Sequence, residues 1–504
     1  MDSNETERYR YSCKVNIFLR STIPVVGCEI NPSVSAIWKG RFPVPFDSYS
    51  LNYMWYRAKI CNDEAAMIDE GRKDWVLVSC SKNYVPKVDD LGQILKLDCV
   101  VVDLLTNMAL SEPNETITEP VIAFPVAQPR SMVSTPSLCE SSSLCSTSLN
   151  DFIFSILSYN ILSDIHIYLK SHKCPLWALV WEYRCHNLLR EIIKYDADII
   201  CLQEVQSDHF ENFLKPELTE KGYMAIYKKR NNEIYTGTQC VADGCATFYR
   251  RHLFKEVEKF GVEFNEETSR VVEALEPDLR SEASKHFMKD NVALVVILET
   301  LENCHTKYAV QSRICVVNTH ICSNQKLPDV QLFQVVTLVN QLEKMLQSEI
   351  PLLICGDFNS VPQSDPYNFV VTGKLERCAS IDPYGVYQHL KLFHRFSLAS
   401  AYASFGSAVA RQERRLGKFN QETREPLFTF CSKQSSKTLD YIFYTVNSLE
   451  VEAALDLLDH EDVADGLPSP LWSSDHIALM SSFRIKKGGS VCQPLIRGHK
   501  GRYC

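Results

Sequence analysis

The sequence predicts an α/β protein in which a large domain of mixed strands and helices follows a small β-rich unit. From about residue 151, apolar runs of strand length alternate with stretches of helical spacing. Before residue 110 the apolar runs are short, which is typical of a β-rich unit. With 504 residues, 45% of them hydrophobic, the chain suits one large domain and a smaller one.

Four segments are expected from these patterns. The β-rich unit spans 1–110, with apolar runs at 15–19, 75–78 and 100–105, and no leucine-rich periodicity is found in it. Residues 111–150 are rich in serine and are expected to form a flexible linker. The large domain spans 151–486, and 487–504 form a C-terminal tail.

Within the large domain, apolar runs predict strands and helical spacing predicts helices. The strands are expected at 152–159, 198–202, 314–318, 352–355 and 441–444. The helices are expected at 181–194 and, with amphipathic character, at 330–345. Several strands run into polar residues, which predicts one site at the rim of a sheet.

Bulk properties exclude several classes of protein. The net charge of −9 means that a nucleic-acid substrate would need a local positive field or a metal ion. No stretch reaches membrane-spanning length and the N-terminus lacks the apolar core of a signal peptide. The 20 cysteines are scattered through apolar runs, and without a secretory signal they are expected to be reduced thiols of a cytosolic or nuclear protein. They contain no C-x-x-C pair, which argues against a zinc finger.

The candidate site residues follow apolar strands. They are Asn160, Glu204, His320, Asp357 with Asn359, and the late pair Asp440 and His476. Each alone has a structural explanation, such as a helix cap or a satisfied histidine. Together they match phosphodiester hydrolysis, which needs a hard cation on oxygen ligands, an activated water and a stabiliser of the developing charge.

The residue types suggest individual roles. Glu204 and Asn160 can hold Mg²⁺. Asp357 can orient or deprotonate water while Asn359 donates to phosphoryl oxygens. His476 is held in one tautomer and kept cationic if Asp440 pairs with it.

The motifs around these residues resemble the endonuclease/exonuclease/phosphatase superfamily. They are Tyr-Asn-Ile-Leu, Leu-Gln-Glu-Val, Asn-Thr-His, Gly-Asp-Phe-Asn-Ser-x-Pro, Leu-Asp-Tyr-Ile-Phe and Ser-Asp-His, in that order. Longer blocks, among them Asp-Gly-Cys-Ala-Thr-Phe-Tyr-Arg and Leu-Pro-Ser-Pro-Leu-Trp-Ser-Ser-Asp-His, resemble the carbon catabolite repressor protein 4 deadenylases, with plant members nearest. The resemblance covers about 155–485.

This resemblance implies a four-layer sandwich of two mixed β-sheets flanked by helices. It also implies removal of poly(A) from the 3′ end of messenger RNA with release of 5′-AMP, in cytoplasm and nucleus. One or two Mg²⁺ ions are implied, with Mn²⁺ as an alternative. A deadenylase complex is an implied partner, although the docking leucine-rich repeats of fungal and animal members are absent.

The family's functional residues carry over onto matching positions. Glu204 is the implied principal metal ligand, with Asn160 beside it and Asp475 as a candidate for a second ion. Glu204, His320, Asp357, Asn359, Asp440 and His476 form the implied catalytic core. Substrate binding is implied for Asn291 and for the positions of Phe430 and Ser435.

The segment before Asp440 departs from the family pattern. The usual amide is replaced by Phe430, a base-stacking aromatic by Ser435 and a glycine by Lys437. Loss of a stacking ring removes roughly 1–3 kcal/mol of base affinity unless Phe430 takes over. Adenine preference is therefore open, whereas the phosphodiester chemistry is not.

Two further hypotheses remain: a phosphatase on a nucleotide or sugar phosphate using the same core, and a non-catalytic RNA-binding component of an mRNA decay complex. The basic residues at 228–230 and 411–415 contact RNA phosphates or are solvated loop charges; the sequence favours neither.

Overall fold

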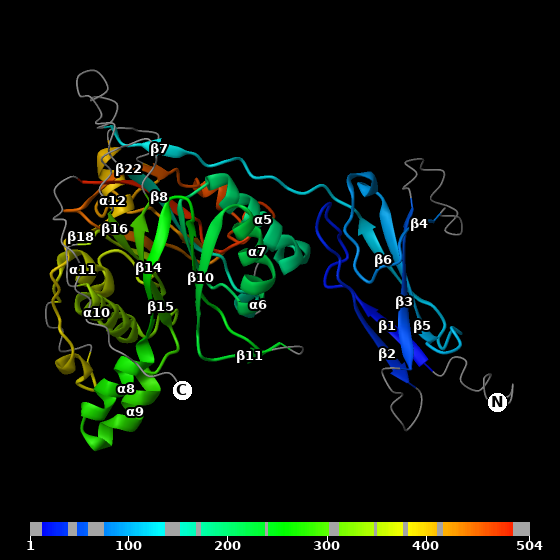
Figure 1. The fold of residues 1–504 in the computed structure, drawn as a ribbon, viewed down its shortest axis with the longest axis horizontal. Coiled ribbons are helices and arrows are strands. Elements are labelled where there is room, and N and C mark those ends of the chain that lie inside the picture. Colours follow the sequence, from blue (N-terminus) through cyan, green and yellow to red (C-terminus); the bar gives the residue numbers. More distant parts are fainter. Residues whose placement is uncertain are drawn as a thin grey trace. The chain divides into compact units, whose positions relative to one another are not determined.

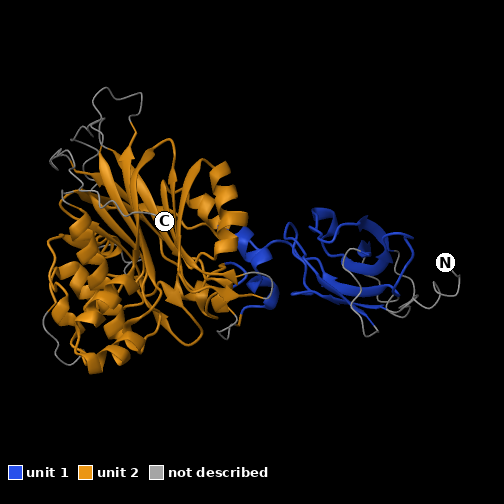
Figure 2. Ribbon diagram, turned by 60° about the horizontal axis from the view of Figure 1, so that its bottom comes forward, with its two compact units in different colours: residues 1–127, 174–188, 469–471 blue, residues 128–173, 189–468, 472–504 orange. Residues whose placement is uncertain are grey.

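The computed structural model divides the chain into two compact units, which Figure 2 distinguishes by colour. Unit 1 comprises residues 1–127, 174–188 and 469–471, and unit 2 comprises 128–173, 189–468 and 472–504. The structure describes residues 13–38, 48–58, 75–136, 152–167, 173–236, 240–301, 312–346, 350–375, 382–410 and 417–486.

Unit 1 contains a four-stranded antiparallel sheet in the order β4-β3-β5-β6 and a β1–β2 hairpin (Figure 1). The strands are β1 Cys13–Phe18, β2 Ser33–Trp38, β3 Tyr49–Ala58, β4 Val76–Ser79, β5 Ile94–Asp103 and β6 Asn114–Pro120. The central strand β5 buries every second residue, from Leu95 to Val101, because successive side chains of a strand point to opposite faces. The predicted β-rich N-terminal unit is thus confirmed.

Unit 2 is built on two mixed sheets. A seven-stranded sheet has the order β10-β13-β9-β8-β23-β22-β7, and a six-stranded sheet has the order β14-β15-β16-β17-β21-β18. The first contains β7 Met132–Ser134, β8 Ile153–Asn160, β9 Ile199–Gln203, β10 Tyr223–Lys229, β13 Gly244–Arg250, β22 Leu449–Leu455 and β23 Leu479–Ile485. The second contains β14 Phe254–Glu263, β15 Val292–Thr300, β16 Arg313–His320, β17 Leu352–Asp357, β18 Leu398–Ser400 and β21 Asp440–Thr445.

The two sheets face each other, since β8 and β9 of the first contact β16 and β17 of the second. Their inner faces are joined by polar as well as apolar contacts. The Gln203 amide donates to Asn318 Oδ1 over 2.8 Å, and the Asn318 amide donates to backbone carbonyls of the opposite sheet at Leu202 and Ala246. Such hydrogen bonds between buried groups of the two sheets fix how the sheets stack.

Helices cover the outer faces of unit 2 (Figure 1). On the seven-stranded sheet lie α7 Lys215–Glu220, which contacts β10, and residues 189–195, the part of α5 Trp181–Tyr195 that belongs to unit 2 (Figure 1). Against the six-stranded sheet lie α8 Phe264–Ala274, α9 Pro277–Phe287, α10 Pro328–Met345 and α11 Asp365–Thr372, which share a core with β15, β16 and β17. Helices, two sheets and helices make four layers, so the expected sandwich is confirmed.

The strands and helices predicted in the large domain all form, within a few residues of their expected limits. Two predictions need correction. Helix α10 is not amphipathic: its polar Gln331, Gln334 and Asn340 are buried with its apolar residues because α8, α11 and the sheet surround it.

The second correction concerns the linker. Within 111–150, strand β6 belongs to unit 1 and β7 pairs with β22 in unit 2. Residues 111–136 are therefore part of the folded units, because backbone pairing overrides their Ser- and Pro-rich composition. Residues 137–150, the tail 487–504 and the basic run 411–415 lie outside the described residues. Among the helices that are described, none is long and apolar enough to cross a membrane.

Candidate active site

Three predicted site residues lie side by side across the six-stranded sheet. The register of β16, β17 and β21 places His320 opposite Asp357, and Asp357 opposite Asp440. Gly356 makes this row possible: at its φ of +149°, an added Cβ would lie 1.9 Å from the Thr319 carbonyl oxygen. Gly356 thus lets β16 and β17 approach each other next to the carboxylate of Asp357.

The seven-stranded sheet contributes Asn160 and Glu204 to the same site. Asn160 ends β8 and Glu204 directly follows β9, its parallel neighbour. The Asn160 amide nitrogen donates to Glu204 Oε1 over 3.2 Å and to Asp357 Oδ2 over 3.1 Å. One buried amide therefore links carboxylates of the two sheets.

Two of the predicted site residues have a strained backbone. Glu204 and Asn359 have φ values of +55° and +49°, a left-handed region that is uncommon for residues other than glycine. The Asn359 backbone N–H donates to Asp357 Oδ1 over 2.8 Å, so its unusual conformation holds the carboxylate in place. Such strain is concentrated at functional sites.

His476 forms a buried pair with Asp440. Its Nδ1 lies 2.8 Å from Asp440 Oδ2, which also accepts a hydrogen bond from the Thr429 hydroxyl over 2.6 Å. Its Nε2 lies 3.6 Å from Asp357 Oδ2. Burial lowers the pKa of His476, but Asp440 and Asp357 outweigh burial and raise it to about 10. The imidazole is therefore a cation at neutral pH, as the sequence predicts for a histidine paired with Asp440.

Asp357 lies between the two histidines. Burial raises its pKa to about 7, with Asp440 adding to the rise and His476 opposing it. A carboxylate with a pKa near neutrality is suited to accept a proton from water and to release it again.

His320 has the opposite charge state from His476. Its Nε2 lies 3.5 Å from Asp357 Oδ2, while its Nδ1 lies 3.0 Å from a guanidinium nitrogen of Arg230. Burial lowers the pKa of His320 well below its usual range, and the positive charge of Arg230 lowers it further. The ring is neutral. Arg230, the last residue of the basic run 228–230, is thus held against His320 and is not a freely solvated loop charge.

The donor set fits a hard divalent cation. Asn160 brings two carboxylates, Glu204 and Asp357, to one buried place, and carboxylate oxygens are the ligands that Mg²⁺ prefers. The Asn160 amide oxygen accepts from the Leu162 backbone N–H over 3.0 Å, so its N–H groups face the site. Asn160 therefore orients the carboxylates in this structure, and its role as an oxygen ligand stays a prediction.

A second group of possible ligands, Asp357, Asp440 and His476, has atoms within 4.8 Å of one another. The protonated imidazole of His476 has no lone pair to offer a metal, because both of its ring nitrogens carry hydrogen. We therefore regard this buried group as an acid–base arrangement and not as a ligand set.

Two further predicted site residues, Asp475 and Asn291, are buried next to the histidines of the site. Asp475 is buried beside His476, its Oδ1 lying 3.9 Å from the His476 Nε2. Asn291 is also buried, and its amide donates to the His320 carbonyl over 2.9 Å and accepts from Gln334 over 3.2 Å. Asn291 therefore supports the backbone of His320, where substrate binding was predicted.

Phe430 and Ser435 lie on a short hairpin next to the site. The hairpin pairs β19 Phe430–Cys431 with β20 Ser436–Lys437. The Phe430 ring packs against the His476 imidazole with centroids 5.1 Å apart, whereas Ser435 closes the turn through hydrogen bonds to Ser432. Phe430 thus places an aromatic ring beside His476, and the position of Ser435 carries no ring.

Sequence reasoning missed the residues that hold the site together. Ser163 donates its backbone N–H to Glu204 Oε2 over 2.9 Å, and the Ser474 hydroxyl donates to the Asn160 carbonyl over 2.6 Å. The Thr429 hydroxyl donates to Asp440, and the Arg230 guanidinium contacts His320. Only their closeness to the motifs in sequence could have pointed to Ser163, Ser474 and Thr429; nothing in the sequence connects Arg230 with His320.

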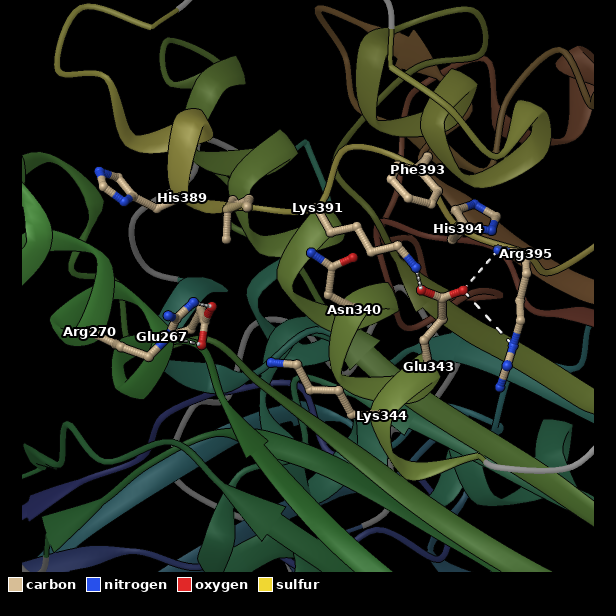
Figure 3. Close-up of a pocket in the computed structure, with 11 residues that line it drawn as sticks. Glu267, Arg270, Asn340, Glu343, Lys344, His389, Lys391, Phe393, His394 and Arg395 are labelled. Atoms are coloured by element: carbon tan, nitrogen blue, oxygen red, sulfur yellow. Dashed lines mark hydrogen bonds and ion pairs between the residues drawn. The ribbon is translucent and has the colours of Figure 1, made fainter.

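A separate pocket of about 470 Å³ lies on the helical layer and is lined by residues of α8, α10 and 389–395 (Figure 3). Its charges are largely paired, as Glu343 contacts both Lys391 and Arg395 and Glu267 contacts Arg270. None of the predicted site residues lines it. This pocket is therefore separate from the candidate site at the polar strand ends.

Comparison with known proteins agrees with this geometry. The model of the Endonuclease/Exonuclease/phosphatase family matches residues 157–476, which span all the motifs from β8 to His476. The chain belongs to this family.

Within the family, the chain is similar to carbon catabolite repressor protein 4 homologues, as the motifs predict. It is 43% identical over 431 residues to Carbon catabolite repressor protein 4 homolog 1 of Arabidopsis thaliana, covering 82% of this chain and 71% of that protein. It is 30% identical over 375 residues to the CCR4-Not complex 3′-5′-exoribonuclease subunit Ccr4 of Saccharomyces cerevisiae, covering 70% and 41%.

A solved structure is also similar. ANGEL2, described as a 2′,3′-cyclic phosphatase and crystallised with adenosine-2′,3′-vanadate, matches with a TM-score of 0.53 and 30% identity, covering 71% of this chain and 99% of that one. The relatives therefore include both a nuclease and a phosphatase.

Proposed function

We propose that this protein is a Mg²⁺-dependent 3′-to-5′ exoribonuclease that shortens the poly(A) tails of messenger RNA and releases 5′-AMP. The observation that carries this proposal is the position of Asp357, between a cationic and a neutral histidine and linked through Asn160 to Glu204. The identity with carbon catabolite repressor protein 4 homologues and the exoribonuclease name of the yeast relative support RNA as the substrate.

The residues of the site suit attack of water on a phosphodiester. The oxygen of water forms a bond to phosphorus while Asp357 accepts the proton of that water. The P–O bond to the 3′ oxygen of the preceding nucleotide breaks, and this oxygen takes up a proton from Asp357 or from solvent to become the new 3′ hydroxyl. The His476 cation donates to phosphoryl oxygens as negative charge develops. The side-chain amide N–H of Asn359 that does not bond the Ile321 carbonyl donates to them as well. Asp440 and Thr429 keep His476 oriented through its Nδ1 side.

Glu204 and Asp357 would hold Mg²⁺, or Mn²⁺ in its place, with Asp475 available for a second ion. The metal would supply a positive charge next to the phosphoryl oxygens in a protein whose net charge is −9. We further propose that the protein acts in cytoplasm and nucleus within a deadenylase complex, because several relatives are named as CCR4-Not complex subunits. We also propose that its catalytic domain extends from about residue 128 to 486.

A second candidate is removal of a 2′,3′-cyclic phosphate from RNA ends. The ANGEL2 structure favours it, since a phosphatase with the same fold is 30% identical. The change at Ser435 is consistent with a site that reads the terminal phosphate more than the base.

One experiment separates the candidates. Purified protein is incubated with 5′-labelled oligo(A), and with the same RNA ending in a 2′,3′-cyclic phosphate, across a Mg²⁺ titration and with free nucleotides as competitors. Progressive shortening with release of 5′-AMP supports the exoribonuclease. Loss of the cyclic phosphate without shortening supports the phosphatase, and binding without turnover of either RNA would reject both. The Asp357→Asn variant is the control for contaminating nuclease.

A further inference from the structure

The Arg230 side chain is largely buried and packs against the neutral histidine of the site. It follows β10, and one terminal guanidinium nitrogen lies 3.0 Å from His320 Nδ1. Its Nε lies 3.3 Å from Asp243 Oδ2, and its other terminal nitrogen lies 3.8 Å from Asp290 Oδ1. The charge of the arginine is thus balanced, and its orientation fixed, by two carboxylates on different elements.

This contact determines where His320 carries its hydrogen. A guanidinium group has only donors and stays protonated, so the atom that it contacts must be an acceptor. Nδ1 of His320 is therefore unprotonated, and in a neutral ring the hydrogen is on Nε2. His320 Nε2 has no hydrogen-bond partner among the described residues, and it lies 3.5 Å from Asp357 Oδ2.

The surroundings keep the arginine and the histidine in register. The Arg230 backbone N–H donates to the Asp243 carbonyl over 2.9 Å, which joins the ends of β10 and β13. The Asn291 amide holds the His320 carbonyl. Arg230 and His320 are thus fixed by backbone contacts on separate sheets. Their contact therefore depends on how the two sheets pack and not on local sequence.

We propose that Arg230 is a positioning residue, which selects the Nε2–H tautomer of His320 and so gives the site a neutral hydrogen-bond donor toward the phosphoryl group. This inference rests on the proposed phosphodiester hydrolysis. Nothing in the family comparison assigns a role to Arg230. With the hydrogen on Nδ1, the Nε2 atom would present a lone pair to the phosphate oxygen. The two lone pairs repel each other, so His320 could not act as a donor in that tautomer.

The alternative is that Arg230 only neutralises Asp243 and Asp290 and thereby supports the fold. The two roles make different predictions, because a purely structural residue changes stability without changing the His320 tautomer. Asp243 and Asp290 are near Arg230 in either case. The tautomer of His320 is therefore the property that distinguishes a positioning role from a structural one.

The first test measures the tautomer directly. Protein labelled with ¹⁵N-histidine, metal-free and without RNA, is compared as wild type, Arg230→Met and Arg230→Lys, and His320→Gln identifies the signals. We expect the wild type and Arg230→Lys to keep one tautomer, because lysine is also a donor only. Arg230→Met should show both tautomers or a protonated ring. An unchanged His320 signal in Arg230→Met would overturn the proposal.

The second test measures turnover. We expect Arg230→Met to lower kcat by roughly 10- to 100-fold, with little change in KM. This is the range for residues that orient the groups of a site without contacting the substrate. Arg230→Lys should recover most of the loss. Arg313→Met is the matched control, since Arg313 lies at the opposite end of β16 and pairs with Glu299 over 3.1 Å. Equal kcat in both methionine variants would overturn the proposal.

These outcomes are distinguishable from failure of the proposed function. The tautomer measurement needs no substrate, so it tests the positioning role even if oligo(A) is not cleaved, and kinetics then use the RNA end that is turned over. If Arg230→Met does not fold, Arg230→Gln serves in its place: glutamine can donate to or accept from Nδ1, so a mixed tautomer is expected. A single Nε2–H tautomer together with wild-type kcat in Arg230→Gln would then overturn the proposal.

Discussion

The buried carboxyl group of Glu425 should make the stability of this protein depend on pH. Glu425 is fully buried and accepts a hydrogen bond from the Tyr367 hydroxyl over 2.9 Å. Burial raises the pKa of Glu425 from 4.5 to about 7, although hydrogen bonds from Ser400 and Tyr367 oppose the rise. The folded protein thus keeps this proton at pH values where the unfolded chain has lost it.

The sign and size of the effect follow from this difference. Because the folded-state pKa is the higher one, the stabilising contribution is complete below about pH 4.5 and is lost as pH rises to about 7. Each pH unit between the two values corresponds to about 1.4 kcal/mol, so the loss is about 3 kcal/mol at pH 8. Glu425→Gln keeps an acceptor for Tyr367 and removes the charge. It should therefore be more stable than wild type by about 3 kcal/mol at pH 8, and by less than about 1 kcal/mol at pH 5.

Urea denaturation at pH 5, 6, 7 and 8 measures this difference. Glu422→Gln is the matched control, because it removes the same charge from an exposed position on the same segment. The control should follow wild type at every pH. If the free energy of unfolding of Glu425→Gln rises and falls with pH as wild type does, the carboxyl group is not the source and the reasoning is refuted.

Three further predictions concern the catalytic site. Glu204→Ala should abolish Mg²⁺-dependent hydrolysis while thermal unfolding stays near wild type; activity within a few-fold of wild type would remove Glu204 from the metal site. Asp357→Asn should lower turnover by orders of magnitude with modest change in RNA affinity, because an amide cannot accept the proton of water; lost binding with retained turnover would make Asp357 a substrate anchor. Phe430→Ala should weaken oligo(A) binding by roughly 1–3 kcal/mol if this ring stacks on the base, and Ser435→Phe should increase preference for oligo(A) over oligo(U). Unchanged preference in both variants places base recognition elsewhere.

The strands that carry the site could be predicted because they are fully buried on both faces. Such strands are continuous apolar runs, and the polar residue at one end of each run is conspicuous: Asn160 and Asp357 end their strands, and Asp440 begins its strand. The sequence also places them in an order that the family shares. What it does not contain is the register, which in the structure depends on Gly356 allowing β17 to approach Thr319.

The supporting residues could not be predicted, because their partners are distant in sequence. Arg230 and His320 are 90 residues apart and reach each other from different sheets. Asn291 shows the converse difficulty: it lies in a block typical of the family, which predicts substrate binding, and in the structure its amide donates to a backbone carbonyl. A polar residue near a site motif has the same sequence signal whether it contacts the substrate or supports a residue that does.

The two histidines of the site show why residue type alone does not define a role. His320 and His476 lie at nearly equal distances, 3.5 and 3.6 Å, from the same oxygen of Asp357. Asp440 and Asp357 raise the pKa of His476, whereas burial and Arg230 lower that of His320. One ring therefore brings a full positive charge and the other a neutral donor to a single carboxylate. With two cations, Asp357 would be held in its charged form and would be a weak base; with two neutral rings, the charge that develops on phosphate would have no cationic side chain beside it. The asymmetry set by Arg230 and Asp440 avoids both outcomes.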